Sequence, residues 1–213
     1  MAVREFSVVS AEVMLKARTE CLLTPVGILM GLETVADCMN DPEIRPWFGH
    51  LLQDELMPQM PEEGRNEAVI QACRYLSFKP ASLKLCDLAD GLIDSWALHI
   101  LPLMSEKTPR MIQAFAMLIM LFTGVRRGED QGYYLPQEAL THQRLTRDEK
   151  ALRSFSRLSW DMQADSLCYA ALADADIWGR DLRELTFLPD RLTEAMTDIQ
   201  LLGLRQVLAG GDE

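Results

Sequence analysis

The sequence predicts an all-α, multi-helix domain, and three features of the chain support this. Apolar residues recur at three- and four-residue steps along most of its 213 residues, as expected for helices with one buried face. Clusters of Pro, Gly and Asn separate these segments. Beyond the first ten residues, no segment alternates apolar and polar residues as a strand does. With 48% hydrophobic residues, the chain is long enough to bury the core of one domain.

Residues 11–48 are predicted to hold the central helix and its end. Apolar residues from Leu22 to Val35 share one broad face of a single helix, and the Asn-Asp-Pro sequence at residues 40–42 ends it. The domain is predicted to span residues 11–213.

Residues 1–10 are predicted as an N-terminal extension, with Phe6 and Val8 in a short extended segment. The same helical periodicity, with Gly and Pro as boundaries, predicts the remaining elements. Further helices are expected at residues 42–57, 66–75, 82–101, 110–122, 146–157, 161–173 and 188–208. Thr108 and Pro109 are typical of an N-cap and a first helical residue, and residues 124–138 are predicted to form an exposed loop.

Composition disfavours several classes of partner. A net charge of −11 argues against nucleic acid, whose binding depends on Lys and Arg, and against an anionic membrane surface. The most apolar window, residues 111–122, is too short to cross a bilayer. Five widely spaced cysteines, with no CxxC pair and no Cys/His cluster, predict free thiols and no metal site. With no secretory signal apparent, a cytoplasmic location is expected.

Several segments, in order, resemble the C-terminal helical domain of the long-chain mannitol (polyol) dehydrogenase family, most closely its tagaturonate reductase (altronate oxidoreductase) branch. The resemblance covers roughly residues 11–208. It rests on PVGILMGLETVADCMNDPE from Pro25, LLQDELMP with Glu55 and Pro58, Asp90-Gly91 with Ile100-Leu101-Pro102, AFAMLIMLFTG from Ala114, YYLPQ after Gly128, and DIWGRDLRELTFLPDRL with Gly203-Leu204-Arg205.

This resemblance implies an NAD-dependent oxidoreductase in which an N-terminal Rossmann domain binds NAD and the helical domain closes the substrate cleft. No Rossmann domain is predicted here, because the sequence has no GxGxxG after a strand and no βαβ pattern. The chain alone is therefore expected to bind no cofactor. NAD would come only through a separate Rossmann domain, either on another subunit or on a full-length paralogue.

The family's catalytic motif, Lys-x4-Asn-x2-His at the start of the central helix, is not preserved. In the family, the lysine acts as general base on the alcohol, and the Asn and His orient the alcohol oxygen. Counting back from Pro25, the three positions fall on Glu12, Ala17 and Glu20. Counting forward from Lys16 instead, the second and third positions fall on Cys21 and Thr24.

Lys16 is therefore the one catalytic candidate, and the alternative is a surface lysine paired with Glu20 four residues later. Asp90 and Gly91 are candidate substrate-binding residues. Gly91 could mark a kink, a close helix crossing or a backbone approach to a ligand, and the structural alternative is a packing glycine beside a capping aspartate.

Arg126 and Arg127 are candidates for binding a sugar acid or phosphate, the alternative being a solvated loop. His50, His99 and His142 have no metal-ligand spacing, and a core or cleft histidine is favoured for His99.

Three functional hypotheses follow. The first is a relative of the substrate-binding domain of polyol/hexuronate oxidoreductases that is not catalytic by itself. The second is a half-enzyme completed by a separate Rossmann subunit. The third is a non-enzymatic module that binds a sugar acid or another protein.

Overall fold

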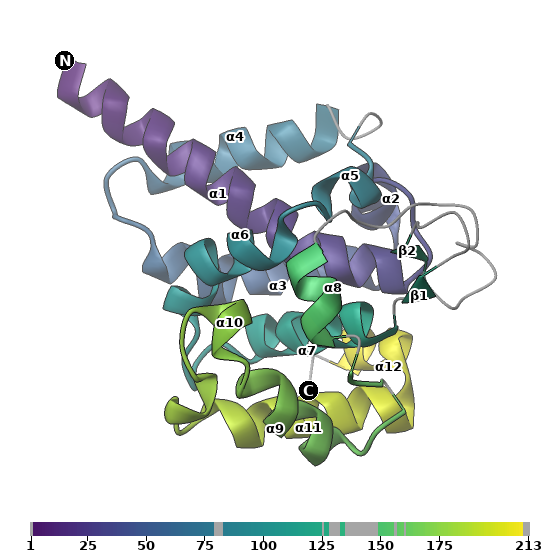
Figure 1. Ribbon diagram of the computed structural model, residues 1–213. Helices are drawn as coiled ribbons and strands as arrows, with labels where there is room; N and C mark the ends of the chain where they lie inside the picture. Colours follow the sequence, from purple (N-terminus) through teal and green to yellow (C-terminus); the bar gives the residue numbers. More distant parts are fainter. Residues whose placement is uncertain are drawn as a thin grey trace.

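The computed structural model describes residues 2–78, 83–124, 126–127, 133–134, 149–155, 157–159 and 161–210. Helices make up most of these residues (Figure 1), and the predicted all-α class is confirmed. The α-helices are α1 (Ala2–Leu29), α2 (Val35–Asn40), α3 (Ile44–His50), α4 (Arg65–Phe78), α5 (Leu85–Leu88), α6 (Leu92–His99), α7 (Pro109–Gly124), α8 (Glu149–Phe155), α9 (Ala164–Leu172), α10 (Ala175–Trp178), α11 (Leu188–Leu202) and α12 (Leu204–Ala209). A π-helix, η1 (Leu51–Leu56), continues α3, and 3-10 helices lie at η2 (Met57–Gln59), η4 (Leu101–Leu103) and η6 (Leu182–Glu184). Two short antiparallel strands, β1 (Arg126–Arg127) and β2 (Tyr133–Tyr134), pair after α7.

Helices stacked in successive layers build the core. α1 packs against α4 on one side and against α7 on the other, and α11 packs on α7 and α9 in the layer beyond (Figure 1). Almost all of α7 is buried, from Met111 onward, so it forms the middle of the molecule. Trp96 stacks on Phe115, which meets Trp178 edge on, so that rings from three helices fill the space between layers.

The first helix begins earlier than the sequence predicts. The extended conformation expected within residues 1–10 is wrong, because α1 begins at Ala2 and runs through residue 11 without a break. No Gly or Pro occurs before Pro25, so nothing stops a helix from extending toward the N-terminus. The domain boundary at residue 11 stays a prediction.

The central helix also ends earlier than expected. A single helix reaching Val35 is wrong, because α1 ends at Leu29 and Gly31 adopts a left-handed φ of 77°. Thr34 then starts α2 with a capping box, in which its side chain accepts from the N–H of Asp37 while the Asp37 carboxylate accepts from the N–H of Thr34. The end of α2 at Asn40 agrees with the predicted stop.

Glycine divides two other predicted helices. The helix expected at residues 82–101 is split into α5 and α6 at Gly91, whose φ is 70°. The helix expected at 188–208 is split into α11 and α12 at Gly203, whose φ is 85°. Both conformations lie in the left-handed region that favours glycine. Gly91 is the N-cap of α6 and follows the end of α5 at Leu88 by three residues, whereas Gly203 both ends α11 and starts α12.

The remaining helix boundaries agree more closely with the sequence prediction. α4 continues to Phe78, beyond the end predicted at residue 75. Most of the loop predicted at residues 124–138, and the first residues of the helix predicted at 146–157, lie outside the described residues. Within the part of the chain that the structure describes, no helix is long and apolar enough to span a membrane.

Candidate functional site

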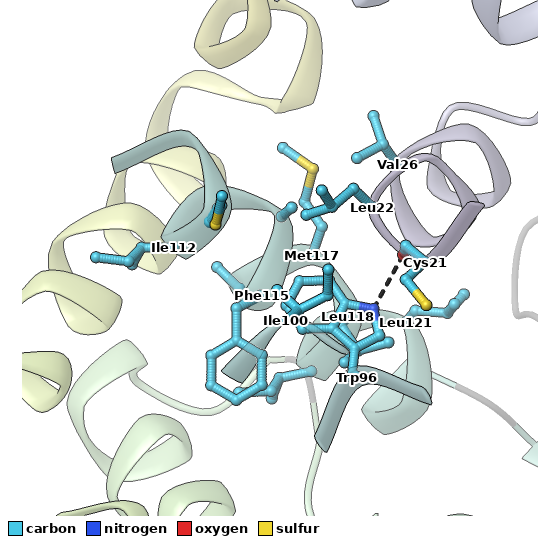
Figure 2. Close-up of a cluster of buried hydrophobic side chains, with 14 of the residues drawn as sticks. Cys21, Leu22, Val26, Trp96, Ile100, Ile112, Phe115, Met117, Leu118 and Leu121 are labelled. Carbon is cyan, nitrogen blue, oxygen red and sulfur yellow. Dashed lines mark hydrogen bonds between the residues drawn. The ribbon is translucent and has the colours of Figure 1, made fainter. Parts of the chain in front are cut away.

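α1 is held to α6 by a hydrogen bond that compensates for a proline. Pro25 lies inside α1 and has no N–H, so it cannot donate to the carbonyl of Cys21 four residues earlier. The indole Nε1 of Trp96 donates to that carbonyl instead, at 2.9 Å (Figure 2). The thiol of Cys21 lies beside the hydroxyl of Ser95, so this turn of α1 faces α6.

The α5–α6 segment runs antiparallel to α1. A Cβ added to Gly27 would lie 2.5 Å from Cδ1 of Leu85, so the start of α5 packs closely on α1 at Gly27. Trp96, in α6, donates to the carbonyl of Cys21, which lies earlier in α1. The chain thus moves toward the N-terminus of α1 as it passes from α5 to α6.

The candidate pair Asp90 and Gly91 forms the turn before α6. Asp90 is exposed. A Cβ added at Gly91 would meet nothing within 4 Å, so no close helix crossing requires the glycine there. Of the alternatives that the sequence leaves open for Gly91, the kink is confirmed, and a substrate-binding role for the pair stays a prediction.

Lys16 lies on the outer part of α1. Its side chain is 41% exposed and its Nζ lies 3.9 Å from Oε1 of Glu20, an i,i+4 pair. Glu12 and Ala17, the other positions in the ungapped register, are half-buried. This arrangement resembles an ordinary surface ion pair.

The gapped register places two buried groups at the remaining positions. Burial, with a smaller contribution from Glu20, raises the pKa of the Cys21 thiol to about 12. The Thr24 hydroxyl is fully buried and donates to the carbonyl of Glu20 at 2.7 Å. Neither side chain can orient an alcohol oxygen as an amide or imidazole would.

Two consecutive residues of α1 carry buried polar atoms without hydrogen-bond partners. Nε of Arg18 is buried and unpaired, and so is the hydroxyl of Thr19, a residue only 1% exposed. Burial also lowers the pKa of the Arg18 guanidinium. Buried polar groups are nearly always paired, so this turn of α1 is unusual.

Arg126 and Arg127 lie in β1, where their backbones pair with Tyr134 and Tyr133. The anion-binding role predicted for them depends on their side chains, which lie outside what the structure describes.

A second buried polar cluster lies at the start of α7, where residues far apart in sequence meet. The carboxylate of Glu55, 3% exposed, accepts from the N–H groups of Arg110 and Met111 at 2.8 and 2.9 Å. The hydroxyl of Thr108, the predicted cap, bonds the backbone of Ser105 instead. Nη1 of Arg110 lies 3.9 Å from Glu55 and 3.5 Å from Asp54, whereas its Nε is buried without a hydrogen-bond partner. The carboxylate of Glu55 acts as a helix cap.

Two pockets lie near this cap. A cavity of about 410 Å³ lies between α7 and α11, with Glu106, Gln113, Arg191 and Asp198 in its lining. A smaller one of about 200 Å³ lies between α3, α7 and α12. Among the described residues, no group of three His, Cys, Asp or Glu side chains could hold a metal ion.

Two curated proteins with similar sequences match the greater part of this chain. Altronate oxidoreductase of Bacillus subtilis (strain 168) is 27% identical over 191 residues, which are 87% of this chain. Altronate oxidoreductase of Cronobacter sakazakii is 30% identical over 203 residues, 88% of this chain. This chain resembles part of an altronate oxidoreductase. It spans only 37% and 39% of the length of these two relatives.

The fold comparison agrees. Mannitol 2-dehydrogenase of Pseudomonas fluorescens, solved as a ternary complex with NAD and D-mannitol, superposes with a TM-score of 0.64 at 17% identity. The match covers 95% of this chain and 40% of the dehydrogenase. No protein-family model matches the chain. The resemblance to the helical domain of the polyol dehydrogenases is therefore confirmed in both sequence and fold.

The described residues do not fit NAD. They contain no parallel strand followed by a glycine-rich turn and a helix, which is the arrangement that holds a dinucleotide pyrophosphate.

Sequence reasoning did not single out Arg18. The available signal was a charged residue between Leu15 and Leu22, in the apolar row that faces the core.

Proposed function

We propose that this helical domain is the substrate-side part of a polyol or hexuronate oxidoreductase and that it does not catalyse hydride transfer by itself. The observation that carries the proposal is the similarity to altronate oxidoreductases over 87–88% of the chain, which covers 37–39% of their length. A nicotinamide cofactor would be held by a separate Rossmann domain. The chemistry of that cofactor is the transfer of a hydride to or from the substrate carbon.

The residues of α1 at the positions of the family's catalytic motif do not supply its general base. A general base must come within hydrogen-bond reach of the alcohol and have a pKa suited to the task. The ungapped register offers Glu12, Ala17 and Glu20, and Lys16 is half exposed beside Glu20.

The purified chain tests this proposal in an NADH absorbance assay with altronate and mannitol as substrates. No turnover is expected from the chain alone, at any ratio of NAD to substrate. Turnover by the chain alone, lost in Lys16→Met and retained in the matched surface variant Lys107→Met, would overturn the proposal and make Lys16 the base.

A half-enzyme is the second candidate, favoured by the confirmed likeness to a part of longer oxidoreductases. Mixing the chain with a Rossmann-domain protein encoded beside its gene should then give NAD-dependent oxidation that neither protein gives alone. A co-purified pair without turnover would contradict the half-enzyme and leave a non-enzymatic binding module.

A further inference from the structure

α12 is a six-residue helix that is joined to α11 through a single glycine. Gly203 has a φ of 85° and a ψ of 158°, a backbone conformation that only glycine adopts readily, and its N–H donates to the carbonyl of Ile199 as α11 ends. A Cβ added at Gly203 would meet nothing within 4 Å, so no neighbouring side chain packs against this point of the chain. The junction between the two helices therefore has the properties of a hinge.

Few contacts hold α12 against α3. Val207 and Leu208 are the buried side chains of α12, with exposed fractions of 6% and 2%. The guanidinium of Arg205 reaches from α12 to the start of α3, where its Nη1 pairs with Oε2 of Glu43 and lies 3.6 Å from Oδ2 of Asp41. The Arg205 side chain is 59% exposed, so salt and water weaken this pairing.

The two carboxylates belong to the frame of the domain. Asp41 is only 8% exposed, and its Oδ1 accepts from the N–H groups of Glu43 and Ile44, both at 3.0 Å. These bonds fix the start of α3 whether or not Arg205 is in place. The ion pair can therefore open on the side of α12 without disturbing α3.

α12 also forms part of the wall of a cavity. The cavity of about 200 Å³ is lined by Trp47 and His50 of α3, by Arg110 of α7, and by Leu208 and Ala209 of α12. Trp47 is 2% exposed. Movement of α12 away from α3 would open this cavity on one side.

We propose that α12 is a lid that swings about Gly203 and opens the cavity beside Trp47, and that the pairing of Arg205 with Glu43 and Asp41 is its clasp. Segments with few buried apolar contacts open locally, at a lower free energy than the core. α11 is anchored more firmly, because it buries Leu188, Leu192, Ala195, Met196 and Ile199. The lid is a property of this chain alone and does not depend on the proposed function.

Amide hydrogen exchange in the purified chain, measured over a series of urea concentrations, tests the lid. The amides of α12 should exchange faster than those of α11, with a weaker dependence on urea, because local opening exposes little surface. Arg205→Met should raise the exchange rate of α12 about threefold and leave that of α11 unchanged. The matched control Arg191→Met removes a similarly exposed guanidinium that pairs with Glu194 inside α11, and it should leave α12 unchanged.

A thiol placed on the lid tests whether the cavity opens with it. Leu208 lines the cavity, so the Leu208→Cys thiol should react with a thiol reagent each time the lid opens. Adding Arg205→Met should raise that reaction rate by the same factor as the exchange rate. Cys168, which is 1% exposed and lies 3.4 Å from the sulfur of Met196 in α11, serves as the internal control and should react only when the domain unfolds.

Equal rates and equal urea dependence for α12 and α11, or for the two thiols, would overturn the lid, because α12 would then open only as the whole domain unfolds. Unchanged rates in the Arg205→Met variant would overturn the assignment of Arg205 as the clasp.

Discussion

Two half-buried arginines in this fold stand in opposite electrostatic settings. Arg110, at the start of α7, lies beside Asp54 and the buried Glu55, whose carboxylate also caps the helix. Arg18, on α1, has no carboxylate within ion-pair distance among the described residues, and the Nε of both arginines is buried without an acceptor. The packed fold accounts for the ion pairs of Arg110, because both carboxylates come from this chain. A buried Nε without an acceptor therefore occurs in this fold with and without a neighbouring carboxylate, and it does not by itself mark a binding site.

The largest expected effect is at Glu55, the buried carboxylate beside Arg110. Glu55→Ala removes the acceptor for two backbone N–H groups and leaves the buried guanidinium of Arg110 with a weaker partner. We expect a loss of about 3 kcal/mol in the free energy of unfolding, measured in urea. The neighbouring change Asp54→Ala, at a half-exposed position, should cost under about 1 kcal/mol. Equal losses in the two variants would contradict a capping role for Glu55.

Part of this arrangement could be predicted from the sequence. Periodicity located α7, α4 and the segments that became α11 and α12, because each carries an apolar face that must be buried. The Glu55 cap was out of reach, since it joins residues 55 positions apart that only the packed fold brings together. The break after Leu29 had a local signal, Gly31 followed by Thr34 and Asp37, which the long apolar row concealed.

The candidate site was harder to predict than the fold. Counting from Pro25 predicts that the family's base, amide and imidazole are missing, and this stays a prediction that depends on residue types alone. The isolation of Arg18 depends on what neighbouring helices do not provide, and an amino-acid sequence does not reveal that. The pairing of Trp96 with Cys21 was equally hidden, although the proline that creates the need for it was plain.

A middle-sized effect is expected at the hydrogen bond that replaces the missing proline N–H. Trp96→Phe keeps an aromatic ring against Phe115 but leaves the buried carbonyl of Cys21 without its indole donor. We expect a loss of about 1–3 kcal/mol in urea unfolding.

A double-mutant cycle isolates that bond. Pro25→Ala restores an N–H that can donate to the carbonyl of Cys21, so Trp96→Phe should cost less in the Pro25→Ala background. The same cost in both backgrounds would mean that the loss comes from ring packing, and the compensation described here would be wrong.

The smallest expected effect is a change in pH dependence. Burial raises the pKa of Glu55 above its usual 4.5, despite the opposing N–H groups of Met111 and Arg110 and the charge of Arg110. A raised pKa in the folded state means that this group's contribution to stability is present below pH 4.5 and is lost as the pH rises through the folded-state value. Glu55→Gln should therefore flatten the fall in unfolding free energy above pH 4.5. An unchanged slope would show that Glu55 ionises normally in the fold.

The most direct measurement of the contrast between the two arginines is a pair of urea unfolding curves, for Arg18→Met and Arg110→Met at neutral pH. Methionine keeps most of the side-chain length and removes the charge. Arg110→Met should lose about 2 kcal/mol, because Glu55 stays buried without its cation. Arg18→Met should match or exceed the stability of the unaltered chain, because an unpaired buried donor is replaced by an apolar group. A comparable loss in both variants would mean that Arg18 already has a partner within the fold, and it would contradict the account.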